Sequence, residues 1–365
     1  MKTIDLIKYR LINQQIAETK FNTPQEIVAW LAAMQAQDFP MAKWAIGLRL
    51  PHLYDADVEN AFNDGTILRT HLLRPTWHFV TPADIRWMLA LTAPRVNAIN
   101  AYYNRKFELD NKVFKRANDI LAKTLQGGKQ LTRVTLKSAL DRAKINADGL
   151  RLGYIMMRAE LDGIICSGVR QGKQFTYALL NERVPPAKTL YREEALAELT
   201  NRYFTSRGPA TIQDFVWWSG LTMKEAKEGI ASVEQNFLRQ AIDGQEYIFA
   251  PTVLENNPAR DKQTTFLMPD YDEYGISYKN RSALFQLHDK NIPAGRQDEN
   301  TYYHMIVIDG LISGTWKRKI KNKTIIVETT SFTKLNKRKH QAVIKAAKRY
   351  SSFVGKVFEG NIEEK

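Results

Sequence analysis

The stretch "LTRVTLKSALDRA", residues 131–143, repeats apolar residues at helical spacing behind Thr132, which is placed to cap the helix. A second helical pattern, "LRLGYIMMRAELDG" at 150–163, ends at a glycine. Two β-rich runs, "IICSGV" and "QFTYALL", follow and are joined by the basic turn "RQGK". Helix, helix and β-hairpin in this order are typical of a winged helix, whose second helix enters a DNA groove. We therefore expect Arg151 and Arg158, on that second helix, to contact DNA.

The same order of elements is predicted on both sides of this module. Before it, helical patterns at 3–19, 23–37 and 54–65 precede the β-rich "ILRTHLLRPTWHFV" at 67–80, with Arg74-Pro75 near its turn. After the Pro-rich break "ERVPPAK", helical patterns at 192–208, 211–221 and 222–233 precede two strands around Asp243-Gly244. The sequence therefore predicts an α+β fold with three tandem winged-helix modules, at residues 1–110, 111–183 and 184–263.

Alternating strands replace the helical patterns after residue 264. The segment "TTFLMPDYDEYGISYKNRSALF" predicts a strand followed by a polar loop. Residues 302–332 then contain three strands, the first two joined by Asp309-Gly310, a strong hairpin signal. A basic helix, "NKRKHQAVIKAAKRYSSFVG", follows. We predict a β-rich basic C-terminal domain at 264–360 and a disordered tail at 361–365.

Composition narrows the class of protein. The 365 residues include 53 Lys and Arg against 39 Asp and Glu, which gives a net charge of +14. This excess favours a polyanionic partner, nucleic acid ahead of a membrane, although a basic protein without such a partner stays an alternative. No run of 18 apolar residues exists and "MKTIDLIKYR" lacks a signal-peptide core, so we expect a cytoplasmic protein, monomeric and outside the membrane. The single cysteine, Cys166, excludes an intramolecular disulfide.

A polar motif interrupts two apolar runs in "AAMQAQDFPMAKWAIGLRL", residues 32–50. Gln35 and Gln37 are two residues apart, which on a helix of roughly 3.6 residues per turn places them on different sides. Either one faces solvent, or the helix ends here and an irregular turn brings both amides together. A purely structural alternative is a polar helix terminus whose amides bind backbone carbonyls.

Polar residues also recur at every second position of the first hairpin. We expect them to form one polar sheet face that contacts DNA phosphate or a damaged base, with a merely solvated face as the alternative. His78 could act there as a general base with a pKa near neutrality. The residues are Arg69, His71, Arg74, Thr76 and His78.

Two further charged clusters allow a functional and a structural interpretation. Asp270, Asp272 and Glu273 could bind a nuclease metal, but one cluster lacks the dispersed carboxylates of such sites. We favour loop carboxylates that bind backbone or Arg281, and we expect no metal and no cofactor. The hairpin "TWKRKIKNK" and the final helix could bind phosphates or be solvated faces. Their cations are Lys317, Arg318, Lys319, Lys321, Lys323, Lys334, Lys337, Arg338, Lys339, Lys345, Lys348 and Arg349.

Five segments in order resemble the bacterial winged-helix DNA glycosylases of the AlkZ and YcaQ type, over roughly residues 10–355. The segments are "AMQAQD", "RTHLLRPTWHFVTPADIRWMLALTAPR", "SRGPATIQDFVWWSGL", "LMPDYDEYGISYKNRS" and "VIDGLISGTWKR". The resemblance implies removal of bulky alkylated purines, unhooking of interstrand crosslinks and a β-hairpin against DNA. It also implies that a Gln-x-Gln or Gln-x-Asp motif is catalytic. Gln35-Ala36-Gln37 matches the AlkZ-like branch.

The chemistry implied by this resemblance suits two neutral amides. A purine alkylated at N7 or N3 is cationic and leaves as a neutral base, so the enzyme must mainly support the sugar cation and deliver water. We expect Gln37 to hold the water, Gln35 to support it and Asp38 to strengthen the field on the sugar. The expected function is hydrolysis of the N-glycosidic bond of cationic N-alkylated purines in double-stranded DNA. The alternatives are a non-catalytic winged-helix DNA-binding regulator and a family member with another nucleic-acid substrate.

Overall fold

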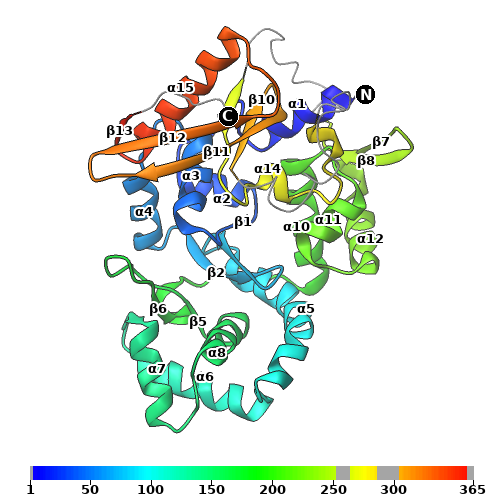
Figure 1. Ribbon diagram of the computed structural model, residues 1–365. Helices are drawn as coiled ribbons and strands as arrows, with labels where there is room; N and C mark the ends of the chain where they lie inside the picture. The colour runs from blue at the N-terminus through cyan, green and yellow to red at the C-terminus, as the bar shows by residue number, and fades with distance from the viewer. Residues whose placement is uncertain (1–2, 252–263, 286–303, 360–365) are drawn as a thin grey trace.

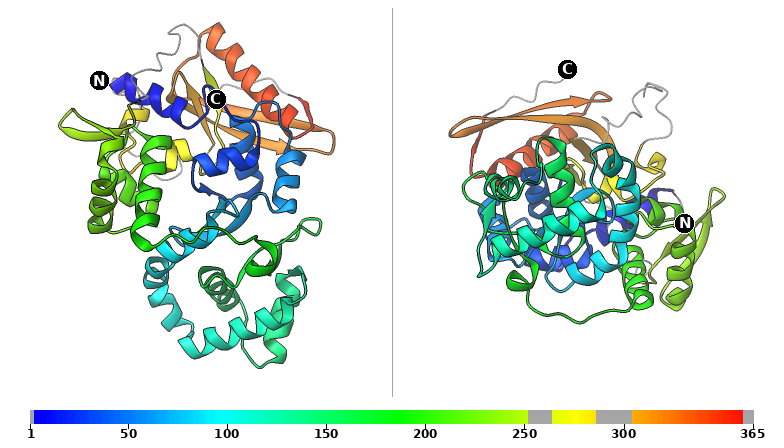
Figure 2. Two further views of the ribbon diagram at one scale, coloured as in Figure 1. Left: turned by 180° about the vertical axis from the view of Figure 1, so that it is seen from behind. Right: turned by 90° about the horizontal axis from the view of Figure 1, so that it is seen from below.

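The computed structural model describes residues 3–251, 264–285 and 304–359, and it shows a mixed α+β protein (Figures 1 and 2). The segment from about residue 107 to 183 lies below the rest of the protein in Figure 1, and helix α5 connects the two. No helix within the described ranges is long and apolar enough to cross a membrane. The predicted tail at 361–365 lies outside the described residues.

The N-terminal part of the chain surrounds a three-stranded sheet in the order β1-β3-β2. Thr23 and Glu26 form a capping box at the start of α2, with Pro24 in its first turn, and Gly65 ends α4 in the left-handed conformation. The elements are α1 (Thr3–Asn13), α2 (Pro24–Trp30), β1 (Met34–Gln35), α3 (Phe39–Arg49), α4 (Asp55–Asp64), β2 (Leu68–Leu72), β3 (Thr76–Val80) and α5 (Ile85–Lys106).

Two predicted helices are shorter than expected. The helix predicted at 3–19 ends at Asn13, and Gln15 adopts a positive φ of 60°. The helix predicted at 23–37 ends at Trp30, and Ala32 adopts a positive φ of 58°. Both residues interrupt the right-handed helical conformation. The polar motif therefore follows a helix and lies on a short strand.

The middle part has its own apolar core, which includes Phe114, Leu121, Leu140 and Ile155. Its three strands have the order β4-β6-β5, and Thr132 caps α7 as predicted. The elements are α6 (Asn111–Leu125), β4 (Leu131–Thr132), α7 (Arg133–Arg142), α8 (Leu150–Leu161), β5 (Ile165–Ser167), β6 (Thr176–Leu179) and α9 (Leu180–Arg183).

The third part follows the predicted order of three helices and a hairpin. Thr211 caps α11, and Asp243-Gly244 forms the hairpin turn with both residues at positive φ. The elements are α10 (Arg192–Arg207), α11 (Ile212–Ser219), α12 (Met223–Ser232), η1 (Glu234–Asn236), β7 (Leu238–Ile242) and β8 (Gln245–Phe249).

The C-terminal part is a five-stranded sheet in the order β13-β12-β11-β10-β9, with α15 on it. The segment after its first strand is mostly irregular, as predicted, but it contains the short helix α14 and is largely buried. Asp272, Glu273, Tyr274 and Tyr278 are buried there, because their polar groups find buried partners. The elements are β9 (Thr265–Leu267), α14 (Glu273–Ile276), η2 (Ser282–Leu284), β10 (Met305–Ile308), β11 (Leu311–Ile320), β12 (Thr324–Ser331), α15 (Lys337–Phe353) and β13 (Val357–Phe358).

The β1-β3-β2 sheet lies between two apolar cores. Met34 and Phe79 belong to a core that also contains residues of β10 and α15. Leu68 and Val80 belong to a second core with α5, α10 and α11. Each core contains residues from more than one predicted module, and the module boundaries themselves stay a prediction. The strand that carries the Gln motif is therefore held from two sides.

Candidate functional site

The Gln-x-Gln motif lies on and just after β1. Gln35 pairs with His78 of β3, and the Ala36 N–H donates to the Trp77 carbonyl at 2.7 Å. Successive residues of a strand point to opposite faces, so residues two apart can share a face, as they cannot on a helix. Ala36 is fully buried, Gln35 is 9% exposed and Gln37 is exposed. The alternative of a helix terminus is wrong, because α2 ends at Trp30.

Each glutamine side chain is oriented by one hydrogen bond. Gln35 Oε1 accepts from Arg74 Nη2 at 3.1 Å, and Gln37 Oε1 accepts from the Trp77 N–H at 3.4 Å. Within the described ranges, neither side-chain NH₂ group donates a hydrogen bond. Both amides thus keep donors for a substrate or a water. Asp38 is the N-cap of α3 and accepts from the Met41 N–H at 3.1 Å.

The expectation of one polar hairpin face is wrong. In the register of β2 and β3, Arg69 is opposite Phe79 and His71 is opposite Trp77, whereas His78 is opposite Thr70. Directly opposed residues share a face, so Arg69 and His71 lie on one face and Thr76 and His78 on the other. The solvated-face alternative is also wrong, since Arg69, His71 and His78 are buried.

Arg69 and His71 are engaged with protein. Arg69 donates to the carbonyls of Ala36 at 2.9 Å and Gln37 at 3.4 Å, and it stacks 4.3 Å from the Trp77 ring. Burial lowers the pKa of Arg69 to about 10, so it remains a cation at neutral pH. His71 Nδ1 pairs with the buried carboxylate of Glu160 on α8. These contacts remove both residues from the expected DNA surface and make Arg69 a support of the motif backbone.

His78 lies beside Gln35 and is fully buried. Its Nδ1 is 3.0 Å from the Thr76 carbonyl, which assigns the proton to Nδ1 and leaves Nε2 as an acceptor. Burial, followed by the charge of Arg74, lowers the pKa of His78 to about 3, so a base with a pKa near neutrality is wrong. Nε2 and the hydroxyls of Thr70 and Thr76 are buried and have no hydrogen-bond partner among the described residues.

The three carboxylates of the acidic trio pair with three different side chains. Asp270 pairs with His304 at 2.7 Å, Asp272 with Arg49 at 2.8 Å, and Glu273 with Arg207 at 2.7 Å. The carboxylates of Asp272 and Glu273 also accept from backbone N–H groups, as the loop interpretation predicts. The described residues contain no group of three or more His, Cys, Asp or Glu that could hold a metal ion.

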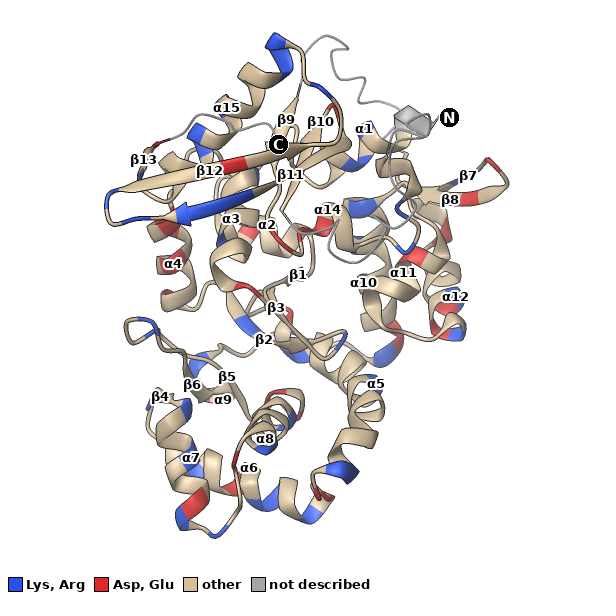
Figure 3. Ribbon diagram, in the orientation of Figure 1, with Lys and Arg blue, Asp and Glu red and all other residues tan. Residues whose placement is uncertain are grey.

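The cationic side chains of the β11–β12 hairpin lie on both faces of the strand. Lys317 and Lys319 are exposed, near the blue end of β11 in Figure 3. Arg318, on the other face, donates to Met41 Sδ and lies 3.5 Å from His304 Nε2. Near its tip, the hairpin therefore contacts α3 at Met41, three residues after Asp38 and close to the Gln motif. On α15, Arg349 is not part of an exposed track, because it donates to the Gly47 carbonyl.

The two arginines of α8 expected to contact DNA form hydrogen bonds or ion pairs within the protein. Arg151 donates to the carbonyls of Asn146 and Phe107, and Arg158 pairs with Asp162 at 2.7 Å.

Sequence reasoning missed Arg207 as a site residue. Arg207 donates to the Leu31 and Ala33 carbonyls just before the motif, 176 and 174 residues away in the chain. No local pattern could reveal such a contact.

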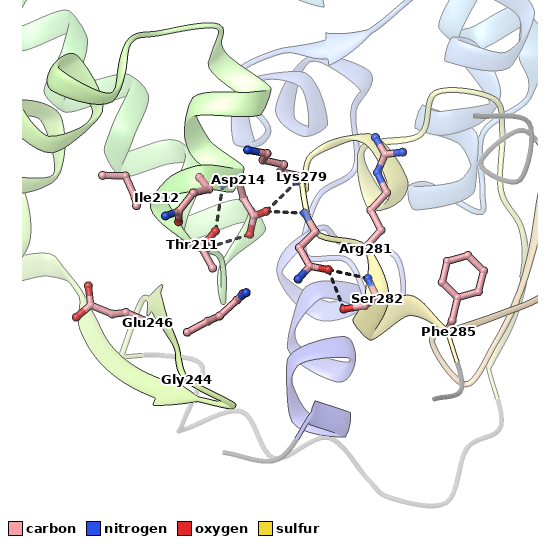
Figure 4. A pocket seen from close by; sticks show the side chains of 12 residues that line it. Thr211, Ile212, Asp214, Gly244, Glu246, Lys279, Arg281, Ser282 and Phe285 are labelled. Atoms are coloured by element: carbon pink, nitrogen blue, oxygen red, sulfur yellow. Dashed lines mark hydrogen bonds between the residues drawn. The ribbon is translucent and has the colours of Figure 1, made fainter. Parts of the chain in front are cut away.

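A cavity of about 650 Å³ lies elsewhere, between the start of α11 and the segment before η2 (Figure 4). Asp214 in this cavity accepts from the Thr211 N–H at 2.9 Å and the Lys279 N–H at 2.8 Å. The carboxylate is thus used to join two backbone segments. Neither Gln35 nor Gln37 lines this cavity.

Comparisons with known proteins agree with the described fold. A family model described as "DNA glycosylase AlkZ-like" matches residues 28–353. The "Interstrand DNA cross-link repair glycosylase" of Streptomyces sahachiroi is 24% identical over 223 residues, a match that covers 58% of this chain and 59% of that relative. The solved structure of "Streptomyces sahachiroi DNA glycosylase AlkZ" has a TM-score of 0.77 at 18% identity, over 98% of this chain and 99% of that chain. At this identity the structural likeness shows a shared fold. Because the family model covers most of the sequence, the chain belongs to the AlkZ-like DNA glycosylase family.

Proposed function

We propose that this protein is a monofunctional DNA glycosylase that hydrolyses the N-glycosidic bond of cationic N-alkylated purines, including those in interstrand crosslinks. The observation that carries the proposal is the pair of glutamine amides on and just after β1, both with side-chain donors still available. The name of the Streptomyces sahachiroi relative, an interstrand cross-link repair glycosylase, supports the part of the proposal that concerns interstrand crosslinks.

The reaction asks little of an acid catalyst. The bond between the sugar C1′ and the base nitrogen breaks with its electron pair going to the cationic base, which leaves neutral. Water then bonds to C1′, and the proton that it loses passes to bulk water. Gln37 Oε1 has a second lone pair that can accept from this water, while Arg74 fixes the Gln35 amide beside it. Positioning of this kind can lower a barrier by several kcal/mol.

Buried acceptors next to the motif support a role for ordered water. Nε2 of His78 and the hydroxyl of Thr76 lie on the strand that pairs with β1. Buried polar groups of this kind are commonly satisfied by internal water. A neutral His78 can accept a hydrogen bond from such a water and help to order it without being the general base.

Binding to DNA would use exposed cations outside the motif. We infer that the three helix-and-hairpin parts are winged-helix modules and that Lys317 and Lys319 contact phosphates, with a net charge of +14 favouring the encounter. Arg74, Thr76, Arg151 and Arg158 are partly exposed and remain proposed contacts. Asp38 remains a proposed source of negative field near the sugar. A regulator without catalysis explains the charge but gives no reason for the paired amides.

The deciding experiment is incubation with duplex DNA that carries N7-methylguanine, followed by detection of free base and abasic sites. We expect base release by the parent protein and little release by a Gln35→Ala, Gln37→Ala double variant purified in parallel. The double variant controls for contaminating glycosylases. Tight binding of the duplex without base release by the parent would favour the regulator.

A further inference from the structure

The edge of β1 that faces away from β3 is closed by a buried ion pair in place of a strand. Arg207 of α10 donates to the carbonyls of Leu31 and Ala33, each at 2.9 Å. Glu273 of α14 accepts from the Gln35 N–H at 2.9 Å through Oε1. In a strand, the backbone groups of residues 33 and 35 point to the same edge. The two side chains thus complete the hydrogen bonding of the segment that leads into the motif.

The pair itself is fully enclosed. The side chains of Arg207 and Glu273 are both 0% exposed and 2.7 Å apart. Glu273 Oε2 also accepts from Ser277 Oγ at 2.8 Å and Trp218 Nε1 at 2.9 Å. Burial raises the pKa of Glu273, but the Arg207 charge and these hydrogen bonds outweigh it and hold the pKa at about 2. The carboxylate is therefore ionised and rigidly held at neutral pH.

We infer that Glu273 and Arg207 are positioning residues for base excision: they fix the backbone at Gln35, and so the direction of the glutamine amide, from parts of the chain outside the N-terminal sheet. This inference rests on the proposed function. A displacement of about 1 Å at a catalytic group can lower a rate roughly 100-fold, so loss of this clamp reaches the chemistry without touching substrate.

A second buried ion pair provides a matched control. Arg49 and Asp272 are also 0% exposed and 2.8 Å apart, and Asp272 is adjacent to Glu273 in sequence. Arg49 donates to Gln14 and to the Ala45 carbonyl, and Asp272 caps α14. Neither side chain hydrogen-bonds residues 31–37. The two pairs therefore share burial and chemistry and differ in whether they hold the motif.

The main test compares Glu273→Gln with Asp272→Asn in the full chain. The amide at 273 can keep one acceptor for the Gln35 N–H, but its NH₂ group opposes the donors of Arg207, Ser277 or Trp218. Both variants should lose stability, because each leaves a buried arginine without its carboxylate. Under conditions where both are folded, we expect Glu273→Gln to lower the single-turnover rate of base release 10- to 100-fold, with the Kd for DNA within twofold of the parent. Asp272→Asn should retain the parent rate per folded molecule.

A milder pair of variants keeps the inference testable if the charge variants do not fold. Trp218→Phe removes one donor to Glu273 and keeps both charges. Trp44→Phe removes an equally buried indole, which donates to the Leu267 carbonyl at 2.8 Å, on the opposite core. We expect a several-fold slower rate for Trp218→Phe and an unchanged rate for Trp44→Phe.

Equal rates per folded molecule in each matched pair would overturn the positioning role and leave the clamp purely structural. Failure of the proposed function gives another pattern, in which the parent protein itself releases no base. If the parent protein excises, Gln37→Ala is slow and Glu273→Gln is unaffected, the proposed function stands and only the positioning role of Glu273 and Arg207 is refuted.

Discussion

Gln35 and Gln37 lie two residues apart and meet different surroundings. Gln35 is buried, and its side chain and backbone are both bound, by Arg74 and Glu273 respectively. Gln37 is exposed, and its side chain accepts one long hydrogen bond. A catalytic role and a structural role can therefore be separated most cleanly at Gln37.

We predict that Gln37→Ala slows single-turnover base release about 10- to 1,000-fold, each 1.36 kcal/mol of barrier being about tenfold. The melting temperature and DNA affinity should stay near those of the parent, because Gln37 is exposed. Gln37→Asp should be tolerated better, since a carboxylate still accepts from water. Gln35→Ala should slow release and also lower stability by about 1 kcal/mol through its lost hydrogen bond. A stable Gln37→Ala protein that excises at the parent rate contradicts this catalytic role.

His78 makes stability depend on pH. Its pKa in the folded state is about 3, against 6.5 in a free histidine, so the unfolded chain takes up a proton between these values and the folded protein does not. Stability should therefore be complete above about pH 6.5 and fall as the pH drops toward 3. The loss between pH 7 and pH 5 should be about 2 kcal/mol.

Urea unfolding of the parent and of His78→Gln at pH 7 and pH 5 measures this loss. The variant lacks the titrating group and should show a smaller pH dependence, with the remainder coming from other groups. Identical pH dependence in both proteins would mean that His78 is not held neutral.

At the scale of elements, the two Asp-Gly turns have the same local sequence but differ in how tightly the rest of the protein packs against them. Asp243-Gly244 and Asp309-Gly310 all have positive φ, as two-residue hairpins require. A Cβ at Gly244 meets nothing within 4 Å, whereas one at Gly310 would overlap Ile7 Cγ2. The second turn is packed against α1, and the first is open.

We predict that Gly244→Ala costs about 1–2 kcal/mol of stability, from its left-handed backbone alone. Gly310→Ala should cost distinctly more, because Ile7 is buried and its branched side chain must move. Thermal or urea unfolding of the two variants measures the difference. Equal losses would show that α1 can shift freely on the sheet.

The β11–β12 hairpin presents its outward cations at the proposed DNA surface. We predict that Lys317→Glu, Lys319→Glu weakens duplex binding and makes affinity less dependent on salt, with the slope smaller by about 0.9 for each phosphate that the hairpin no longer neutralises. Binding measured from low to moderate salt gives the slopes. An unchanged slope in the hairpin variant would remove these lysines from the interface.

Across the whole molecule, the cores divide the chain differently from the sequence modules. Two of them meet at the β1-β3-β2 sheet. The first draws residues from both ends of the chain, the second runs from residue 32 to residue 278, and the third lies within residues 109–177. The motif thus lies on the sheet against which the first two cores pack. Because the third core lies within its own residues, we expect the middle part to open by itself more readily than the rest.

We predict that Leu140→Ala, a truncation in the third core, destabilises the middle part by about 2–5 kcal/mol. Hydrogen exchange should become faster in α6, α7 and α8, with little change in β9, β10 and β11. Equal acceleration in both regions would show that the molecule opens as one unit.

The sequence by itself determined the features that depend on neighbours within a few residues. The Thr132 cap and both Asp-Gly turns occur as predicted, because each is completed by groups three or fewer positions apart. The alternation of helices and hairpins, and the family, followed from the same local patterns.

Only the tertiary structure decided how the motif is held. The helix predicted at 23–37 stops early, where Arg207 binds the carbonyls of Leu31 and Ala33. The hairpin residues divide between two faces because strand register, rather than spacing along one strand, fixes which residues are opposed. Glu273 reaches Gln35 across 238 residues of chain. A buried polar group takes whichever partner the folded packing brings to it, and that partner has no fixed position in the sequence.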